Sequence, residues 1–485
     1  MIGSAVSINY FHKRGLILLT LTETLVSISD WMYLYILVGL LIAVGLFLSI
    51  RLGFVQIRLF PETFRVVMEK KSNKEAISSF QALMVATASR VGTGNIAGIA
   101  TALVAGGPGA LMWMWIMAII GGASAFAEST LAQIYKERDG AIFKGGPAYY
   151  IEKAMGMRWL GLVFATILII TFAYGFNGLQ SYNIVSAFEY YSSDWEHSSV
   201  PVYLGIVLAV ISMVLFFGGV DKISKVSSIL VPIMAGLYIF LGIVVVLFNI
   251  EKFPEVISMI VTDAFDFRAI FGGMLGSCLV MGIKRGLFSN EAGMGSAPNA
   301  AASSEVSHPV KQGLVQVLSV FIDTIIICST SGFLVLFSGV YEKGGELDGI
   351  PLVQAAVETV FGSLGVHFMT AAVALFAFTS LIGNFFYAEF NARFISTNKV
   401  FLFIFRCTCV VMVFVGAINS MDAAWALADI TMGCMAIVNI IALFCLNGTV
   451  KRTLADYMRQ KKEGKDPKFV AKDAGVKNTT PGIWD

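Results

Sequence analysis

The feature that most constrains this chain is its series of long apolar runs, several of which contain no charged residue. Four uncharged runs cover residues 31–50, 159–188, 226–249 and 430–450. A helix that crosses the hydrocarbon core of a bilayer, ~30 Å thick, needs roughly 20 apolar residues. Charged residues make up only 14% of the 485 residues, against roughly 25% in soluble globular proteins. The sequence therefore predicts an all-α protein embedded in a lipid bilayer.

The apolar pattern predicts eleven membrane-spanning helices. Their expected positions are 31–50, 77–104, 109–134, 159–188, 201–219, 226–249, 268–299, 311–340, 364–392, 400–419 and 423–448. If the first span is set aside, the other ten divide into two sets of five. The expected organisation is an N-terminal segment at 1–30, an extra helix at 31–50, repeats at 77–249 and 268–448, and a tail at 449–485.

The Lys and Arg residues outside the spans are distributed unequally between the two sides of the membrane. One set of alternating loops holds 25 of them and the opposite set holds 5. Because basic loops stay in the cytoplasm, we expect a multi-pass protein of the cell membrane with its N-terminus outside and residues 449–485 in the cytoplasm. The formal net charge of +2 gives no indication of a nucleic-acid partner.

A glycine-rich stretch in the second span resembles a dinucleotide-binding loop in its spacing. Gly92, Gly94 and Ala97 fit the pattern G-x-G-x-x-G/A, but the true fingerprint has an acidic residue about 20 positions further on. No Asp or Glu occurs between Gly92 and Ala127, so the pattern needs another explanation. The seventh span contains a second glycine cluster within 282–295.

The two glycine-rich spans each begin one set of five helices, and the two sets have opposite topology. This arrangement is typical of inverted-repeat transporters with interrupted helices. Unpaired backbone groups are tolerable in a bilayer only where they line a polar cavity or contact a ligand. Half-helix N–H groups favour an anion such as a carboxylate, and freed carbonyls can hold sodium. The alternative is close helix packing, because Gly94-x-x-x-Gly98 and Gly282-x-x-x-Gly286 fit the small-xxx-small pattern.

Signatures of enzymes and pumps are missing from the sequence. It contains no G-x-S-x-G, no H-E-x-x-H and no Walker A motif. The four histidines are scattered over predicted loops and span ends, at His12, His197, His308 and His367. We therefore expect neither an enzyme nor a bound cofactor, and a channel stays open as an alternative to a carrier.

Long stretches of the chain resemble the alanine or glycine:cation symporters. They are "SRVGTGNIAGIATALVAGGPGALMWMW", "AFAESTLAQIYK", "FKGGPAYYI", "GLFSNEAGMGSAPNAAAS" and "FAFTSLIGNFFYAE". The resemblance implies a leucine-transporter-type fold, a five-plus-five inverted repeat with broken helices 1 and 6 and one extra N-terminal helix. It also implies symport of small neutral amino acids, alanine and/or glycine, with sodium by alternating access. A proton-coupled carrier of the same fold is the alternative.

The resemblance further implies a substrate site formed by the unwound part of helix 1 and by residues of helices 3, 6 and 8. The implied residues are Thr93, Gly94, Asn95, Gln180, Phe288, Asn290 and Asn384. On helix 3, Asn177 and Asn183 compete with Gln180 for this role. Asn384 stands where we expect some relatives to carry a bulky Trp, which leaves the preferred substrate size open. The alternative for Gln180 and Asn384 is an interhelical hydrogen bond.

A site for the coupling ion is expected on helix 8. Thr379 and Ser380 follow Phe376 by three and four residues, so their hydroxyls share one helix face with the Phe376 carbonyl. In the resembled fold this face meets two carbonyls of helix 1, which here belong to Ala88 and Val91. Five neutral oxygens suit a hard cation and favour sodium over a proton. The alternative is that both hydroxyls bond back to carbonyls one turn earlier.

Four charged residues lie beside the glycine clusters inside predicted spans, namely Arg90, Lys284, Arg285 and Glu291. Charges in a bilayer are costly, so these residues should face protein or water and form pairs. Arg90 and Glu291 are the expected pair. The pair is expected to act as a gate over the site or as a fixed link between the broken helices.

Overall fold

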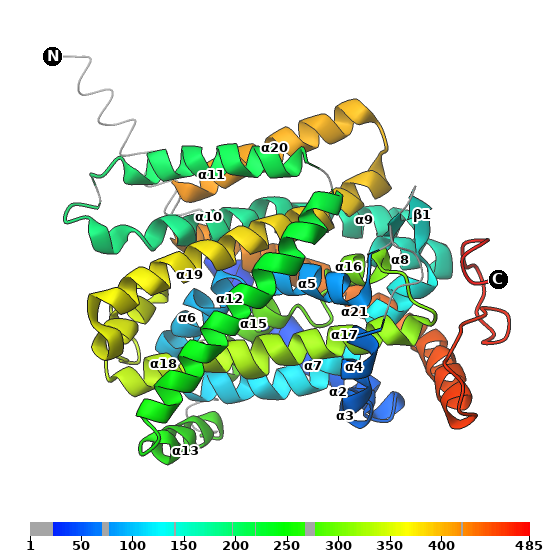
Figure 1. The fold of residues 1–485 in the computed structure, drawn as a ribbon, viewed down its shortest axis with the longest axis horizontal. Helices are drawn as coiled ribbons and strands as arrows, with labels where there is room; N and C mark the ends of the chain where they lie inside the picture. Colours follow the sequence, from blue (N-terminus) through cyan, green and yellow to red (C-terminus); the bar gives the residue numbers. More distant parts are fainter. Residues whose placement is uncertain are drawn as a thin grey trace.

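The computed structural model describes residues 23–69, 77–139, 142–195, 197–218, 220–266, 277–418 and 421–485. Over these ranges the chain is almost entirely helical, as Figure 1 shows. Their one two-stranded sheet is a short antiparallel hairpin of β1 (Glu137–Asp139) and β2 (Ile142–Lys144). The all-α fold class predicted from the sequence is confirmed.

The helices alternate between long apolar segments and short connecting ones. Those of the first half are η1 (Tyr33–Leu37), α2 (Val38–Arg51), α3 (Val55–Arg58), α4 (Phe60–Val67), α5 (Ser79–Arg90), η2 (Thr93–Asn95), α6 (Ala97–Gly106), α7 (Gly109–Ile134), α8 (Pro147–Met155), α9 (Arg158–Ile169), η3 (Ile170–Phe176), α10 (Asn177–Ser186), η4 (Glu189–Tyr191), α11 (Val200–Phe216) and α12 (Val220–Phe248). Those of the second half are α13 (Phe253–Ala264), α15 (Cys278–Asn290), α16 (Pro298–Ser303), α17 (Pro309–Phe321), η6 (Ile322–Cys328), α18 (Ser329–Ser338), α19 (Gly349–Ile395), α20 (Lys399–Ala417) and α21 (Met421–Lys462).

Eight helices among the described residues are long and apolar enough to cross a membrane. They are Glu23–Arg51, Gly109–Ile134, Arg158–Tyr191, Ile223–Phe248, Pro309–Ser338, Gly349–Ile395, Lys399–Ala417 and Trp425–Lys462. Shorter apolar helices cover Thr93–Gly106 and Val200–Phe216. The predicted span 77–104 is divided between short helices, and so is the part of 268–299 that lies within the described residues. The number eleven therefore stays a prediction.

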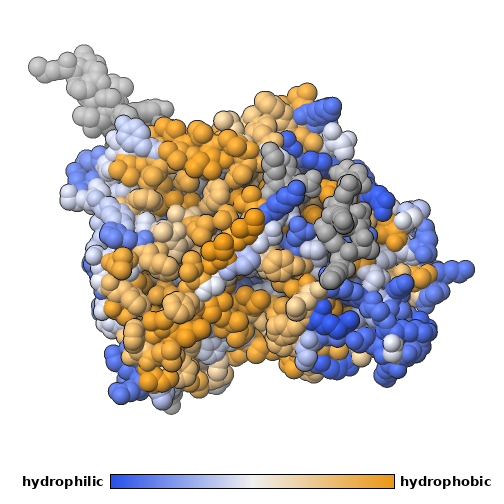
Figure 2. All heavy atoms as spheres, viewed as in Figure 1, coloured by the Kyte–Doolittle hydropathy of each residue, from blue (hydrophilic) through white to orange (hydrophobic). Residues whose placement is uncertain are grey.

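The outer surface separates into an apolar region and a polar end. Figure 2 shows hydrophobic side chains over much of the visible face, whereas hydrophilic ones gather at the end where Figure 1 places the C-terminus. Helix α12 exposes Ile229, Ile233, Leu237 and Phe240. Large exposed apolar areas are rare on soluble proteins and are expected where lipid chains are the solvent.

The first glycine cluster interrupts its span between α5 and α6. Helix α5 ends at Arg90, Gly92 is extended, and a single 3₁₀ turn precedes α6. A Cβ at Gly92 would overlap the Ser380 hydroxyl, and one at Gly94 would overlap the Phe288 ring. These glycines therefore allow side chains from two other helices to approach the unwound backbone.

The second glycine cluster interrupts its span between α15 and α16. Glu291 follows α15 in the left-handed region at φ 54°, and Gly293 and Gly295 have φ of 85° and 88°. Glycine adopts positive φ without the steric cost that other residues bear. The packing alternative holds for a different glycine, because a Cβ at Gly282 would lie 2.5 Å from the Ala110 carbonyl oxygen of α7.

Two helices extend well beyond the predicted spans. Helix α19 contains residues 364–392 but begins at Gly349, with non-helical dihedrals at Gly362. Helix α21 continues to Lys462 because its polar end packs against α4. The Tyr457 hydroxyl donates to Glu62 at 2.8 Å and the Lys461 ammonium group lies 3.0 Å from the same carboxylate. Apolar periodicity identifies only the part of a helix that lies in the bilayer.

Candidate functional site

Polar side chains of α10 bind the unwound segment between α5 and α6. The Thr93 N–H and hydroxyl both donate to Gln180 Oε1, at 3.1 and 2.9 Å. Asn183 Nδ2 donates to the same hydroxyl at 2.8 Å. The structure thus brings together Thr93 and Gln180, and Asn183, expected only as a competitor, joins them.

Asn95 shapes the unwound segment and connects it to the second half of the molecule. Its Oδ1 accepts the Gly92 N–H at 3.1 Å. Its Nδ2 donates to Ser289 Oγ at 3.0 Å and to Asp323 Oδ1 at 2.7 Å. The Ser331 hydroxyl donates to the Asn95 carbonyl. The Asn95 amide is bonded on both sides within the protein, so it fixes the backbone that would face a ligand.

Aromatic side chains cover Gly94. The Phe288 ring lies against Gly94, with centroid distances of 4.6 Å to Phe176 and 4.9 Å to Trp425. The three rings come from α15, η3 and α21. Phe288 is therefore close to the unwound segment, as the resemblance implied.

Three buried amides near the breaks have donors without a hydrogen-bond partner among the described residues, namely those of Asn177, Asn290 and Gln316. Asn290 Oδ1 accepts the Ala292 N–H at 3.0 Å, whereas Asn290 Nδ2 has no partner among the described residues. Asn384 Oδ1 accepts the Ser89 hydroxyl at 2.8 Å, and Asn384 Nδ2 donates to Asn177 Oδ1 at 3.1 Å. Asn177 Nδ2 itself has no partner among the residues that the structure describes. The contacts of Asn384 match the interhelical hydrogen-bond alternative.

Ser380 faces the carbonyls that become free where α5 ends. Its Oγ lies 3.0 Å from the Ala88 oxygen and 3.5 Å from the Val91 oxygen. In a continuous helix the Gly92 N–H would donate to Ala88, but here it is shared between the Arg90 carbonyl and Asn95 Oδ1. Neutral oxygens from α5 and α19 therefore meet at one point, and this donor set suits a hard cation.

Thr379 and Phe376 stand beside this point as a bonded pair. The Thr379 hydroxyl donates to the Phe376 carbonyl at 2.9 Å and lies 3.3 Å from Met234 Sδ. For Thr379 the structure therefore has the back-bonding expected as the alternative, although at i−3. Ser380 bonds across to α5 instead.

A buried carboxylate that sequence reasoning overlooked lies next to Asn95. Asp323, on η6, accepts the Asn95 amide, the Ser289 hydroxyl at 2.5 Å and the Thr324 hydroxyl at 2.9 Å. Its side chain is fully buried. Asp323 is the only acid in the span 311–340, and an ionisable residue inside a span is itself an indication of a functional site.

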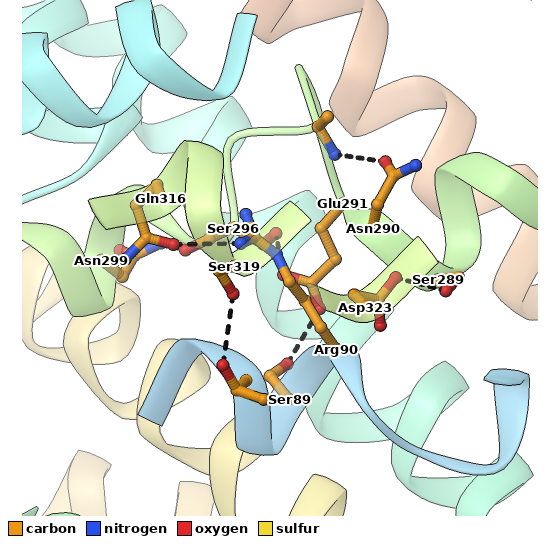
Figure 3. Close-up of polar contacts among 12 residues, drawn as sticks. Ser89, Arg90, Ser289, Asn290, Glu291, Ser296, Asn299, Gln316, Ser319 and Asp323 are labelled. Atoms are coloured by element: carbon orange, nitrogen blue, oxygen red, sulfur yellow. Dashed lines mark hydrogen bonds and ion pairs between the residues drawn. The ribbon is translucent and has the colours of Figure 1, made fainter. Parts of the chain in front are cut away.

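Arg90 and Glu291 face each other, as the sequence predicted. Arg90 Nε lies 4.0 Å from Glu291 Oε2, and both side chains are buried. Glu291 also accepts the hydroxyls of Ser89 and Ser296, at 2.9 and 2.6 Å, and Arg90 donates to Gln316 at 3.0 Å. Figure 3 shows this network joining the end of α5 to the second break. Glu291 is bonded on both oxygens, whereas two of the three Arg90 guanidinium nitrogens have no hydrogen-bond partner among the described residues. These contacts fit a gate and a fixed link equally well.

Lys284 and Arg285 pair with one aspartate of α21. Asp429 lies 2.9 Å from the Lys284 ammonium nitrogen and 2.8 Å from an Arg285 guanidinium nitrogen. The Arg285 guanidinium also lies over the Trp425 ring, 3.9 Å from its centroid. These contacts connect α15 to α21 next to the aromatic cover of Gly94.

Glu128 of α7 is a second overlooked carboxylate. It accepts the Gly293 N–H at 3.3 Å and the Asn439 amide at 2.8 Å. It therefore satisfies a backbone donor that the second break exposes. In the sequence it is the charged residue that ends the uncharged run beginning at Val91.

These features define a class of protein. Two interrupted helices, one near the start of each half, meet at an enclosed polar site within a set of apolar helices. This is the architecture of secondary transporters built from inverted repeats, in which substrate and ion bind at the broken helices.

The chain belongs to the sodium:alanine symporter family, whose model matches residues 19–471. The amino-acid carrier protein AlsT of Bacillus subtilis is 47% identical over 450 residues, which cover 92% of this chain and 94% of that one. The probable sodium/glutamine symporter GlnT of the same organism is 45% identical, with coverage of 92% and 93%. Two further relatives have names that contain the words sodium/proton-dependent alanine carrier protein. The chain is thus a transporter and not an enzyme, as expected.

A solved structure shares the fold. The crystal structure of MhsT in complex with L-phenylalanine matches with a TM-score of 0.58 at 16% identity, over 80% of this chain and 93% of that one. At this identity the likeness supports the fold alone. The leucine-transporter-type fold implied by the sequence motifs is confirmed.

Proposed function

We propose that this protein is a secondary active symporter that carries small neutral amino acids, alanine and/or glycine, into the cell with sodium by alternating access. The proposal rests above all on the contact of Ser380 with the carbonyls of Ala88 and Val91. Val91 lies two residues before Thr93, which Gln180 binds. Ion and substrate then share one interrupted helix.

The unwound segment provides a position for the substrate carboxylate. The N-terminus of α6 offers backbone N–H groups and the positive end of a helix dipole. Asn290 Nδ2 is a further donor, because it has no partner among the described residues. A buried donor without a partner costs about 1–3 kcal/mol, and a substrate carboxylate that accepts this hydrogen bond would remove that cost. The rings of Phe288, Phe176 and Trp425 around Gly94 favour a small side chain.

One observation favours proton coupling as a second candidate. Asp323 is fully buried and accepts three hydrogen bonds, two of them from Asn95 and Ser289. No ion pair within the described residues includes this carboxylate. A carboxylate in this environment would take up a proton or a second cation when the substrate binds.

We also propose the orientation expected from the loops, with the C-terminus in the cytoplasm of a cell-membrane protein. It is supported by the excess of Lys and Arg on one side. The hydrophilic end in Figure 2 coincides with the position of the C-terminus.

Uptake of labelled alanine into vesicles that contain the purified protein tests the proposal. An inward sodium gradient should drive uptake, potassium or a pH gradient alone should not, and unlabelled glycine should compete better than glutamine. Preloaded alanine should accelerate uptake, which a channel would not show. Uptake that is driven by pH alone and lost in Asp323→Asn would assign the coupling to protons. Uptake that ignores both gradients would refute coupled transport.

A further inference from the structure

The polypeptide after α21 folds back onto the helix bundle. We call residues 464–485 the tail segment and the residues between α16 and α17 the linker 304–308. In Figure 1 the tail segment lies beside α8 and β1, at the end of the molecule where α21 ends. Its apolar residues Phe469 and Trp484 are buried, at 4% and 6% exposure, so the tail segment is packed against the protein.

The linker 304–308 is held on two sides, and its first residue also bonds directly to the end of α7. There the Gln133 amide and the Lys136 ammonium group both donate to the Ser304 carbonyl, at 3.0 Å each. On one side, Ser304 forms a parallel bridge with Ile77, and the Glu305 N–H donates to the Ile77 carbonyl at 3.0 Å. Ile77 directly precedes α5, so this pairing joins the outer ends of the two half-helices α5 and α16. These are the half-helices that lead from this end of the molecule to the central site.

On its other side the linker pairs with the tail segment. The Phe469 N–H donates to the Ser307 carbonyl at 2.9 Å, and the Ser307 hydroxyl donates to the Pro467 carbonyl at 2.9 Å. Asp466 lies 3.0 Å from the ammonium nitrogen of Lys311, whose side chain is fully buried. The His308 ring packs edge-on against Phe469 at 5.1 Å. Backbone, charge and aromatic contacts therefore act together.

The far end of the tail segment is anchored to elements outside the broken helices. The Trp484 Nε1–H donates to the Gln133 carbonyl at 2.9 Å, and the Thr480 hydroxyl donates to the Lys136 carbonyl at 2.7 Å. Lys153 of α8 donates to the Thr480 hydroxyl. The tail segment thus connects the linker 304–308 to the end of α7, to α8 and to α21.

We propose that the tail segment is a latch that holds this end of the transport path closed. The site residues Thr93, Asn95 and Gln180 are all buried, so release of a ligand toward this end requires movement of α5, α16 or both. The linker joins those two half-helices, and the tail segment connects it to α7 and α8 in addition to the direct bonds that Gln133 and Lys136 form with Ser304. Undocking of the tail segment would remove the contacts that hold Ser307 and His308, and so would loosen the linker. This inference rests on the proposed transport function.

Loosening the latch is the first test. Trp484→Ala and Phe469→Ala should each raise the rate of sodium-driven alanine uptake about threefold or more, because opening steps often limit turnover. Lys477→Ala is the matched control, since this residue is an exposed part of the same segment and should leave the rate unchanged. A second readout needs no transport. A Ser79→Cys thiol, placed at the start of α5, should react faster with a water-soluble maleimide when Trp484→Ala is also present.

Locking the latch is the second test. Ser307→Cys and Lys468→Cys are combined and joined by a short reducible thiol cross-linker, since both neighbours of Lys468 bond to Ser307. Cross-linking should reduce uptake to about a tenth or less, and reduction should restore it. Each single variant is a control for the substitution itself. Reversibility separates a locked latch from misfolding.

Contrary outcomes are equally clear. Full uptake by the cross-linked protein would overturn the latch, and so would unchanged thiol reactivity at position 79 in Trp484→Ala. If no variant and no parent protein takes up alanine with sodium, the proposed transport function fails. The reactivity at position 79 then still decides whether the tail segment controls access to this end.

Discussion

The Ser380 hydroxyl takes the place of a backbone N–H as the hydrogen-bond donor to a carbonyl of α5. The Ala88 carbonyl has lost its usual donor, the Gly92 N–H, and the Ser380 hydroxyl supplies a donor from another helix. A cation bound at this point would be coordinated by the Ala88 carbonyl oxygen and the Ser380 hydroxyl oxygen. The hydroxyl can do this by rotation, because a serine O–H is both donor and acceptor.

Ser380→Ala should raise the sodium concentration needed for half-maximal uptake by about 5–100-fold, the equivalent of ~1–3 kcal/mol for one lost ligand. Thr379→Ala should have the smaller effect, because its hydroxyl already bonds to Phe376 in the same helix. Thr166→Ala is the matched control, as its hydroxyl bonds back within α9 at an exposed position. Sodium titrations of uptake measure all three. Unchanged sodium dependence in Ser380→Ala would contradict the assignment.

Gln180→Ala should raise the alanine concentration needed for half-maximal uptake by about 5–150-fold, because the Thr93 N–H loses its acceptor at ~1–3 kcal/mol. Asn95→Ala should act similarly through the shape of the segment. Sodium binding measured without alanine should change less in either variant. Asn249→Ala serves as control, since its amide donates only to the Val245 carbonyl within the described residues. Equal alanine titration curves for parent and variants would reject this role.

At the residue level, the positions that carry a distinctive motif could be predicted, and their bonding partners could not. The family resemblance of the motif around Thr93 implied that Ser380 meets Ala88 and Val91, whereas the spacing of Ser380 from Phe376 indicated only that the two share a helix face. Nothing in the sequence reveals that Asn183 adds a bond to Thr93, because three polar residues of α10 have similar spacing. Asp323 was predictable as an isolated acid in an apolar span, but it has no glycine cluster beside it.

At the level of helices, the two interruptions depend on glycines of different kinds. Gly92 and Gly94 provide space, whereas Gly293 and Gly295 provide positive φ. Both kinds mark a break in the sequence, so the positions of the two breaks were predictable. The lengths of α19 and α21 were not, because their ends are fixed by contacts outside the bilayer, such as those of Tyr457 with Glu62.

Gly94→Ala should lower alanine uptake by about 5–150-fold, because forcing an extra methyl group into a packed site costs about 1–3 kcal/mol. The added Cβ would overlap the Phe288 ring. Gly286→Ala is the matched control in the other broken helix, where a Cβ would meet Met114 at an ordinary distance of 3.6 Å. Uptake normalised to protein in the membrane is the measurement. A fully active Gly94→Ala would show that Phe288 does not close over this position.

For the molecule as a whole, the tail segment connects the protonation of groups at one end of the protein to the opening of the central site. His308 packs against Phe469 and faces Asp456, Lys311 and Tyr457. Burial lowers the pKa of His308 below its usual value, although the hydrogen bond to Asp456 opposes this. Burial also lowers the pKa of Lys136 to about 7. With the tail segment docked, the protein therefore binds fewer protons at His308 and Lys136 than it would if undocking exposed these two groups to water.

Acidification should therefore release the latch. For a group whose pKa is depressed on docking, stability is complete above the undocked pKa and is lost as the pH falls through the docked value. For His308 the loss begins near an undocked pKa of ~6.5, and for Lys136 it is already under way above pH 7. Thiol reactivity of Ser79→Cys should therefore increase between about pH 7.5 and 5.5, corrected for thiol ionisation with a free-thiol standard. His308→Gln should flatten this increase, and an unaltered pH profile would contradict the role of His308.

In the proposed function, the unwound stretch from Val91 to Asn95 would contact the ion through the Val91 carbonyl and the substrate through the segment around Thr93, because Ser380 meets that carbonyl and Gln180 binds Thr93. Two ligands that order the same five residues are linked thermodynamically. The factor by which sodium increases the affinity for alanine must equal the factor by which alanine increases the affinity for sodium. A tenfold factor corresponds to ~1.4 kcal/mol. Substitutions that remove a contact to one ligand leave this reciprocal factor intact, whereas those that deform the shared backbone, such as Asn95→Ala, should reduce it equally in both titrations.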